Sequence, residues 1–349
     1  QHMLSDLEKR ILLLEDVVAA QPKHAHAWAE LAMARCEHFG LARRLKGEPV
    51  TLIELRQAAR TGGFQSRDAF ETWLSANTGD DLSDLDQAYR AAKRAVVASP
   101  FQGKAWCVLA NLVFLESFEP QLPQQCVAQA LVVRPHSGTV LFEAARQAEL
   151  DGDPDQAVAY WRECFHVSSE HQTMILNLLR TKISATEAMA MLTPDLAGLR
   201  AIDSVWSQQS TAEDMRSVRE RRLKEVLAAA EASQAPKQSS QRCTLFCEAG
   251  NLFRTLGDNK QASLAMQAAI KANPSHYGVR LACVDLAISL DDPDTAKQHL
   301  DWLLLRRPDA TAVKSRLNQL RKLRVRLASE PTQSVSPHGD SHSASGVRQ

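Results

Sequence analysis

Small and apolar residues recur along this chain with the spacing of an α-helix, and a proline closes most of the runs. Residues three or four positions apart share one face of a helix. Proline ends a helix because it has no amide hydrogen for the backbone ladder. Each run therefore predicts an amphipathic helix that stops close to its proline. The clearest pair of runs lies 34 residues apart, and its matched positions are Ala262 and Ala296, Met266 and Leu300, Ala269 and Leu303, and Pro274 and Pro308.

The same pattern is found elsewhere in the chain. Three segments that align without gaps place a turn before a helix, and they are 152–157, 257–262 and 291–296. A tryptophan stands six residues after two of the prolines, Trp28 after Pro22 and Trp106 after Pro100. These landmarks predict a repeated helix, turn, helix unit. Its apolar stripe recurs upstream as Ala88, Ala92 and Ala95 before Pro100, as Val127 and Ala130 before Pro135, and as Ala157, Trp161 and Cys164 before Ser169.

This 34-residue unit resembles the tetratricopeptide repeat (TPR), which has the same aromatic, glycine, alanine and proline landmarks. The resemblance covers about two thirds of the chain. It implies an all-α fold, an α-solenoid of TPR-like helix-turn-helix repeats with a helical insertion and an atypical central helical segment. In such a fold a small residue at Ala262 or Ala296 lets two helices approach closely, and the bulky residue four positions later fills the space between repeats.

The landmarks also predict how the chain is divided. Residues 1–3 resemble the remnant of an expression tag and are excluded from the fold. The helix expected at Leu4–Ala20 has two interpretations, half of a repeat that continues upstream or a natural capping helix, and both stay open. The expected parts are an N-terminal TPR-like array at 4–185 with an insertion at 40–82, an atypical segment with a polar linker at 186–241, a C-terminal TPR pair with a capping helix at 242–328, and a disordered tail at 329–349.

The insertion carries its own helix signals. Thr51 with Glu54 forms a capping-box pattern before a first short helix, and Ser66 precedes a second one. The aromatic side chains available to this segment are Phe64, Phe70 and Trp73. We weigh two roles for them, docking onto the array and forming a partner-binding arm. Docking is favoured, because large apolar side chains are more often buried than displayed.

The repeat register is lost after the helix expected at Gln172–Ile183. Ser210 with Glu213 predicts the cap of a long charged helix that ends near Ala232. The polar stretch Gln234–Gln241 predicts a linker or exposed loop. A last helix is expected at Ala310–Ala328, with one apolar face formed by Val313, Leu317, Leu320 and Leu327.

Composition limits the classes of partner. Lys plus Arg (41) equals Asp plus Glu (41), so no overall charge attracts the chain to nucleic acid, and no nucleic-acid partner is expected. The cations of the last helix are better explained as a solvated cap face than as a site for anionic lipid or nucleic acid. No apolar run approaches the roughly 20 residues that span a bilayer. The seven scattered cysteines indicate reduced thiols, which favours the cytoplasm, with membrane contact only through an upstream domain of a parent protein.

No catalytic motif, phosphate-binding loop or zinc-protease helix is found in the sequence. The nearest feature to a metal site is Cys243 with Cys247, and two thiolates alone do not complete a tetrahedral zinc site. Both are expected to be packing residues of a repeat. The chain is therefore predicted to be non-catalytic, with no cofactor and no metal.

The expected fold offers instead a concave wall made of the first helices of the repeats. The resemblance implies that asparagines on this wall hydrogen-bond an extended peptide and that a lysine clamps its terminal carboxylate. The positions for such a lysine hold Cys107 and Cys247, which speaks against a carboxylate clamp. An alternative of equal weight is that the wall residues are merely solvated. The candidates for binding a peptide or protein partner are Lys104, Asn111, Arg146, Arg180, Asn251 and Arg254.

A second resemblance concerns the segments 88–118 and 160–195. They are similar to the soluble C-terminal repeat region of bacterial membrane proteins of the O-antigen ligase or polymerase type. This resemblance implies an accessory region whose parent protein performs glycan chemistry in an upstream membrane domain. The sequence thus supports two hypotheses about function. The first is a protein-interaction scaffold, and the alternative is such an accessory region.

Overall fold

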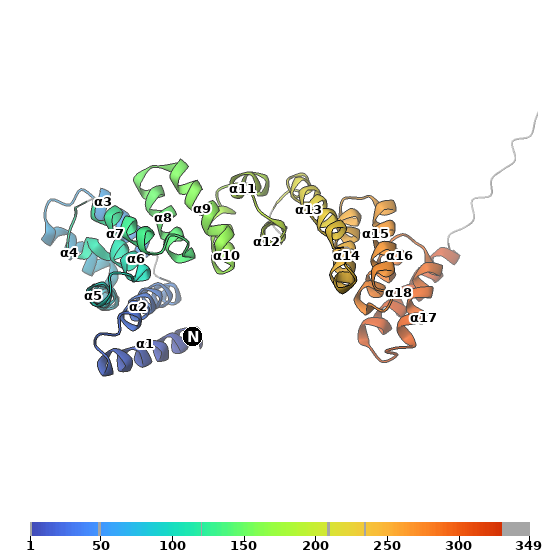
Figure 1. Ribbon diagram of the computed structural model, residues 1–349, viewed down its shortest axis with the longest axis horizontal. Helices are drawn as coiled ribbons and strands as arrows, with labels where there is room; N and C mark the ends of the chain where they lie inside the picture. Colours follow the sequence, from blue (N-terminus) through green and yellow to red (C-terminus); the bar gives the residue numbers. More distant parts are fainter. Residues whose placement is uncertain (1, 48–49, 120, 208–209, 234, 330–349) are drawn as a thin grey trace, which may run out of the picture. The chain divides into compact units, whose positions relative to one another are not determined.

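The computed structural model describes residues 2–47, 50–119, 121–207, 210–233 and 235–329, and within these ranges all regular structure is helical. The chain forms two compact units, Gln1–Val218 and Arg219–Gln349, which are described separately (Figure 1). The all-α prediction is confirmed. None of the described helices is both long and apolar enough to cross a membrane.

Unit 1 consists of helix pairs that follow one another in chain order. The first helices of successive pairs are α2, α6, α8 and α10, and the second helices are α5, α7 and α9. The bounds are α1 His2–Ala20, α2 Ala25–Lys46, α5 Leu82–Ala98, α6 Gly103–Leu112, α7 Gln121–Val133, α8 Gly138–Asp151, α9 Pro154–Val167 and α10 Ser169–Leu179. A short 3-10 helix, η2 (Val113–Leu115), extends α6.

Unit 2 repeats this arrangement. Helix α14 (Ser239–Thr255) pairs with α15 (Asn259–Ala272), and α16 (Tyr277–Ser289) pairs with α17 (Pro293–Leu304). The last helix, α18 (Thr311–Ser329), buries Val313, Leu320 and Leu323, while Leu317 and Leu327 are only partly buried. The apolar face of the last helix is therefore rotated slightly from the one expected. The predicted disorder beyond Glu330 lies outside the described residues.

The core of each pair is the small-residue stripe seen in the sequence. Ala262 and Ala296 are completely buried, and so are Ala269 and Leu303. Upstream, the completely buried members of the same stripe are Ala88, Ala92, Ala95, Ala130 and Cys164. Alanine has no side chain beyond Cβ, so two helix backbones can come close at these points. The 34-residue register read from the sequence is therefore the register of the packed structure.

The turns within the pairs explain the recurrent glycine and aspartate. Gly152 and Gly257 have φ of 77° and 87°, a left-handed conformation that glycine adopts without a steric penalty. At the third equivalent turn Asp291 adopts φ of 56° instead, and this conformation costs a non-glycine residue about 1 kcal/mol. The next residue begins the second helix as its N-cap. At the three turns the cap side chains are Asp153, Asp258 and Asp292, and each accepts a hydrogen bond from a backbone amide three residues later.

The insertion folds into two helices, α3 (Leu52–Thr61) and α4 (Arg67–Thr78), followed by the 3-10 helix η1 (Gly79–Asp81). The capping box of Thr51 and Glu54 is present in both directions. Phe70 is completely buried and makes edge contacts with Phe114 and Phe118 after α6, at ring-centroid distances of 6.1 and 4.9 Å. The docking interpretation of the insertion aromatics is confirmed.

The segment between the repeats differs from the sequence prediction in three places. A helix that was not expected, α12 (Leu196–Trp206), follows α11 (Ala185–Leu192). The helix α13 (Ala212–Ala232) is capped by Thr211, whose hydroxyl accepts from the Asp214 amide, one residue later than the predicted Ser210 with Glu213. Helix α14 already begins at Ser239, so the predicted linker 234–241 is partly helical.

A tertiary contact explains the position of the α13 cap. The Asp214 carboxylate accepts hydrogen bonds from the backbone amides of Ala185 and Thr186, both at 3.1 Å, and from the Thr186 hydroxyl at 2.7 Å. It therefore occupies the amino end of α11, where free amides favour an anion. Burial opposes its ionisation, but these hydrogen bonds lower the pKa of Asp214 below its usual value. Sequence-local capping rules cannot include such a contact.

The small-residue stripe makes a direct prediction. Ala262→Leu is expected to lower the free energy of unfolding by about 1–3 kcal/mol, because the added side chain has no space in a filled contact. Urea denaturation of the full chain measures the change. Ala228→Leu on α13 of the same unit is the control, because Ala228 is exposed and should tolerate leucine within about 0.5 kcal/mol. Equal losses in both variants would contradict the register.

Candidate partner-binding wall

The exposed side chains of the first helices form the candidate site, which we call the wall. At its start, Lys104 of α6 bonds Glu30 of α2 through a 2.7 Å contact between Nζ and Oε1. Arg10 of α1 bonds the other carboxylate oxygen of Glu30 at 2.8 Å. Burial raises the pKa of Glu30, but the hydrogen bond and charge of Lys104, together with the charge of Arg10, outweigh burial and lower it. Lys104 is half-exposed, so this ion pair lies at the surface of the wall.

Asn111 has a different environment from the one expected. It is buried, and its side-chain oxygen accepts a hydrogen bond from Arg56 of the insertion helix α3. Its amide nitrogen donates to Glu143 of α8 at 2.9 Å. Asn111 is therefore not a solvated wall residue, because both of its polar atoms have partners within unit 1. A substitution there would change stability as well as any binding.

Arg56 links two first helices. Besides Asn111 on α6, it donates from Nη2 to Oε1 of Gln147 on α8 at 2.6 Å. Gln147 in turn donates to both carboxylate oxygens of Asp151 at 3.0 and 3.1 Å. Burial lowers the pKa of Arg56 to about 10, so the group stays charged at neutral pH. We call Arg56, Asn111, Glu143, Gln147 and Asp151 the insertion lock, because they tie α3 across α6 and α8.

A second arginine reinforces this lock from its edge. Arg60 lies one helical turn after Arg56 and donates to the carbonyl of Leu150 and, at 2.8 Å, to the Asp151 carboxylate. Neither arginine was predicted from the sequence to be a site residue. A usable signal was present, since Arg56 and Arg60 stand four residues apart in a short helix and so share a face.

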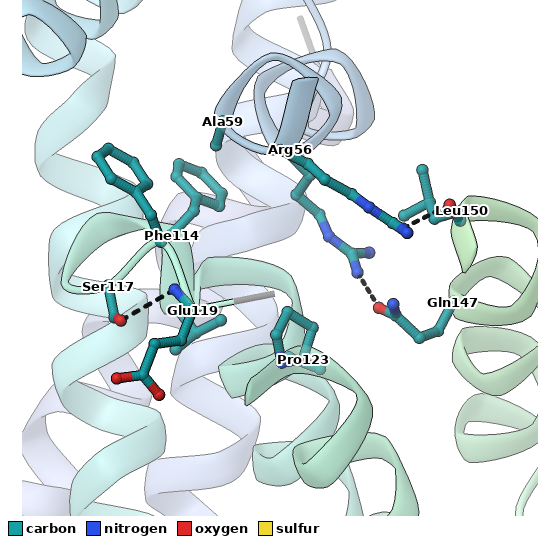
Figure 2. Close-up of a pocket in the computed structure, with 12 residues that line it drawn as sticks. Arg56, Ala59, Phe114, Ser117, Glu119, Pro123, Gln147 and Leu150 are labelled. Carbon is teal, nitrogen blue, oxygen red and sulfur yellow. Dashed lines mark hydrogen bonds between the residues drawn. The ribbon is translucent and has the colours of Figure 1, made fainter. Parts of the chain in front are cut away.

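A cavity of about 150 Å³ lies beside the lock, between α3, the end of α6, the start of α7 and the end of α8. Figure 2 shows Arg56 reaching toward Gln147 on one side of this space, with Phe114 on the opposite side and Pro123 at its base. The side chain of Glu119 points away from Arg56 in this view. The residues that line this cavity are mainly apolar. It is a gap left where α3 packs over the helices of the array.

The remaining candidates of unit 1 lie further along the wall. Arg146 of α8 is 3.7 Å from the Glu143 carboxylate and stacks 5.9 Å from the Phe142 ring centre, with about 20% of its side chain exposed. Arg180 follows the last residue of α10 and is exposed. Lys104, Asn111 and Arg146 thus belong to one connected stretch of first helices, and Arg180 stands apart from their hydrogen bonds.

Unit 2 contains the last two candidates. Asn251 and Arg254 stand three residues apart on α14, and both are exposed. Neither side chain makes a hydrogen bond or ion pair with any residue that the structure describes. Asn251 occupies the repeat position that Asn111 occupies in unit 1, yet it stays open because no insertion covers it. The two asparagines that the sequence treats as equivalent therefore differ in availability.

The cysteines are packing residues. All seven are free, and four of them are buried: Cys107, Cys164, Cys243 and Cys283. Burial raises the pKa of Cys126 and of Cys247 to about 11, so these thiols are protonated at neutral pH. Within the described ranges no group of three or more His, Cys, Asp or Glu side chains could hold a metal ion.

The paired helices, their 34-residue register and their buried alanine stripe fit one known architecture. The chain has the fold of a TPR-like repeat protein. No protein-family model matches the sequence, and no curated protein is significantly similar to it. Proteins of this fold typically serve as protein-interaction scaffolds.

Solved TPR structures are similar to this TPR-like chain at low sequence identity. A chain of the APC/C hetero-tetramer Cut9–Hcn1 is 13% identical with a TM-score of 0.33, and the match covers 88% of this chain and 58% of that one. PilF of Pseudomonas aeruginosa is 15% identical with a TM-score of 0.29, covering 77% and 99%. A tetratricopeptide repeat protein from Parabacteroides merdae is 14% identical with a TM-score of 0.27, covering 72% and 96%. This chain thus spans little more than half of the Cut9–Hcn1 chain.

Proposed function

We propose that this TPR-like chain is a non-catalytic scaffold that binds a peptide or protein partner on the wall of first helices. The observation that carries the proposal is the pair Asn251 and Arg254 on α14. Both are exposed on one face of a helix whose other face is buried, and neither uses its side-chain donors within the described part of the chain. Unused side-chain donors on one helix face can bond the carbonyl groups of an extended peptide backbone.

Unit 1 has a contact set of its own, which is considered separately from that of unit 2. Lys104, Arg146 and Arg180 all expose part of their cationic side chains on first helices or at their ends. Asn111 contributes only indirectly, since the insertion lock occupies its side chain. All seven cysteines are free, which supports a reducing compartment, and we propose the cytoplasm. The accessory role in glycan assembly stays a prediction from sequence resemblance.

Photo-crosslinking in the source cell tests the wall. A photo-reactive amino acid at Asn251 or at Arg254 is expected to capture one and the same protein, identified by mass spectrometry. The matched control position is Lys260, which is exposed in the first turn of the second helix α15 and is expected to capture nothing specific. Capture of that protein from Lys260 at the same yield would move the binding site away from the first helices.

A substitution measures the contribution of the pair. Asn251→Ala combined with Arg254→Glu is expected to reduce recovery of the captured partner at least about fivefold, the effect of losing a contact worth about 1 kcal/mol. Its melting temperature should match that of the parent chain, since exposed substitutions change stability by no more than about 0.5 kcal/mol. Undiminished recovery with an unchanged melting curve would refute the proposed role of these residues.

A further inference from the structure

The chain is neutral overall, but its two units carry opposite net charges. Residues 219–349 contain 20 Lys and Arg against 13 Asp and Glu, a formal charge of +7. Residues 1–218 contain 21 Lys and Arg against 28 Asp and Glu, a formal charge of −7. A charge of this size attracts partners of opposite sign and speeds their association. Unit 2 therefore has its own electrostatic preference, which the whole-chain balance does not reveal.

Three arginines of unit 2 gather around two aromatic rings where α16 begins and α17 ends. The Trp302 ring lies under Arg280, with the guanidinium carbon 4.6 Å from the ring centre, and under Arg306, at 3.7 Å. Arg307 lies 5.2 Å from the centre of the Tyr277 ring. These distances are within the range of cation–π attraction. We call Arg280, Arg306 and Arg307 the arginine patch.

The arginine patch has no carboxylate partner among the described residues. Other arginines of the same unit do have such a partner, as Arg316 has in Asp285 at 2.6 Å. Arg280 uses its donors on the Pro274 carbonyl and on Nδ1 of His299, and Arg306 uses one on the Trp302 carbonyl. Arg306 and Arg307 are exposed. Most of their N–H groups are therefore free to bind an anion.

Helix-end electrostatics does not explain the whole patch. Arg306 and Arg307 follow the carboxyl end of α17, where cations are stabilised by the helix dipole. Arg280, however, lies in the first turn of α16, where the same dipole disfavours a cation. Burial and the charge of Arg280 lower the pKa of His299, which keeps this neighbour uncharged at neutral pH. Arg280 is thus held at an unfavourable place by its stacking on Trp302.

We infer that the arginine patch binds an acidic segment of a partner protein, a short stretch rich in Asp and Glu. A guanidinium that is stacked on a ring keeps its planar fork of donors fixed, which suits bidentate binding of carboxylates. Two cations already lie over the Trp302 ring, so that ring is a poor platform for stacking a nucleic-acid base. The nearby carboxylates Asp301 and Asp309 interrupt the positive surface, so the patch suits a short acidic segment better than a long polyanion. The arginine patch includes none of the six wall candidates and does not depend on the proposed function.

Fluorescence anisotropy with the full chain tests the inference. The probe is a fluorescein-labelled peptide with eight glutamates separated by serines, and a thymidine oligonucleotide with eight phosphates is the comparison ligand. Arg306→Gln combined with Arg307→Gln is expected to weaken peptide binding about tenfold at low salt, the effect of losing one charge-assisted hydrogen bond. Both residues are exposed, so melting curves should not change.

The matched control removes the same charge from another place. Arg321 and Lys322 are exposed on α18 and touch no aromatic ring among the described residues, and Arg321→Gln with Lys322→Gln should weaken peptide binding less than about threefold. Trp302→Leu removes the ring on which the arginines stack but leaves the overall charge unchanged. This variant should bind the peptide more weakly. An equal loss in the α18 variant, tighter binding of the oligonucleotide than of the peptide, or no peptide binding at all would overturn the inference.

Discussion

Trp161→Ala is expected to lower the free energy of unfolding of the chain by about 3–5 kcal/mol, the usual cost of removing a buried aromatic side chain. Trp161 lies on α9 with 3% of its surface exposed. Its ring makes an edge contact with Phe142 of α8 at a centroid distance of 5.0 Å, and its Nε1 donates to Glu149 at 3.3 Å. The change removes packing between the two helices of one repeat. Urea denaturation followed by circular dichroism measures the loss.

Trp106→Ala is the informative comparison for this prediction. From the repeat pattern both tryptophans are expected at packing positions, but Trp106 is only partly buried. Its Nε1 donates to the Pro100 carbonyl at 2.8 Å, as Trp28 does to Pro22. Its loss is therefore expected to cost only about 1–2 kcal/mol, the value of one hydrogen bond and some packing. Equal costs for Trp106 and Trp161 would show that burial does not decide the difference.

Arg56→Met should release the insertion helix α3 and lower the free energy of unfolding by about 3 kcal/mol. The variant retains an apolar stem of similar length but leaves the side-chain oxygens of Asn111 and Gln147 without their donor. Each buried polar group without a partner costs about 1–3 kcal/mol. Hydrogen exchange followed by mass spectrometry is expected to show faster exchange in residues 52–78, because this segment is held by the lock and by the aromatic contacts of Phe70.

Arg60→Met provides the control for the lock. Arg60 also donates to α8, but its side chain is 37% exposed, so solvent can replace the lost contacts. A cost below about 1 kcal/mol is expected, as for other exposed ion pairs. If Arg56→Met leaves exchange in 52–78 unchanged, the insertion is held by its aromatic cluster alone, and the lock contributes nothing measurable.

Much of the candidate site could not be predicted from the sequence. A comparison of Asn111 with Asn251 shows the reason. Asn111 and Asn251 occupy the same repeat position and have the same local pattern. The first is buried under Arg56, whereas the second is exposed. Arg56 reaches Asn111 across 55 positions and Gln147 across 91. A hydrogen bond between residues so far apart leaves no periodic trace in either segment.

The sequence by itself determined the paired helices of the repeats, their 34-residue register and most of their boundaries. Local forces set these features: a helical apolar period, a proline stop, an aspartate cap and a left-handed glycine all act within a few residues. Only the tertiary structure decided where the insertion docks, which wall side chains remain open, and which residue caps α13. It also decided that three arginines of unit 2 share two aromatic rings. These outcomes depend on burial and on contacts between distant residues, and neither is encoded in the spacing of any one segment.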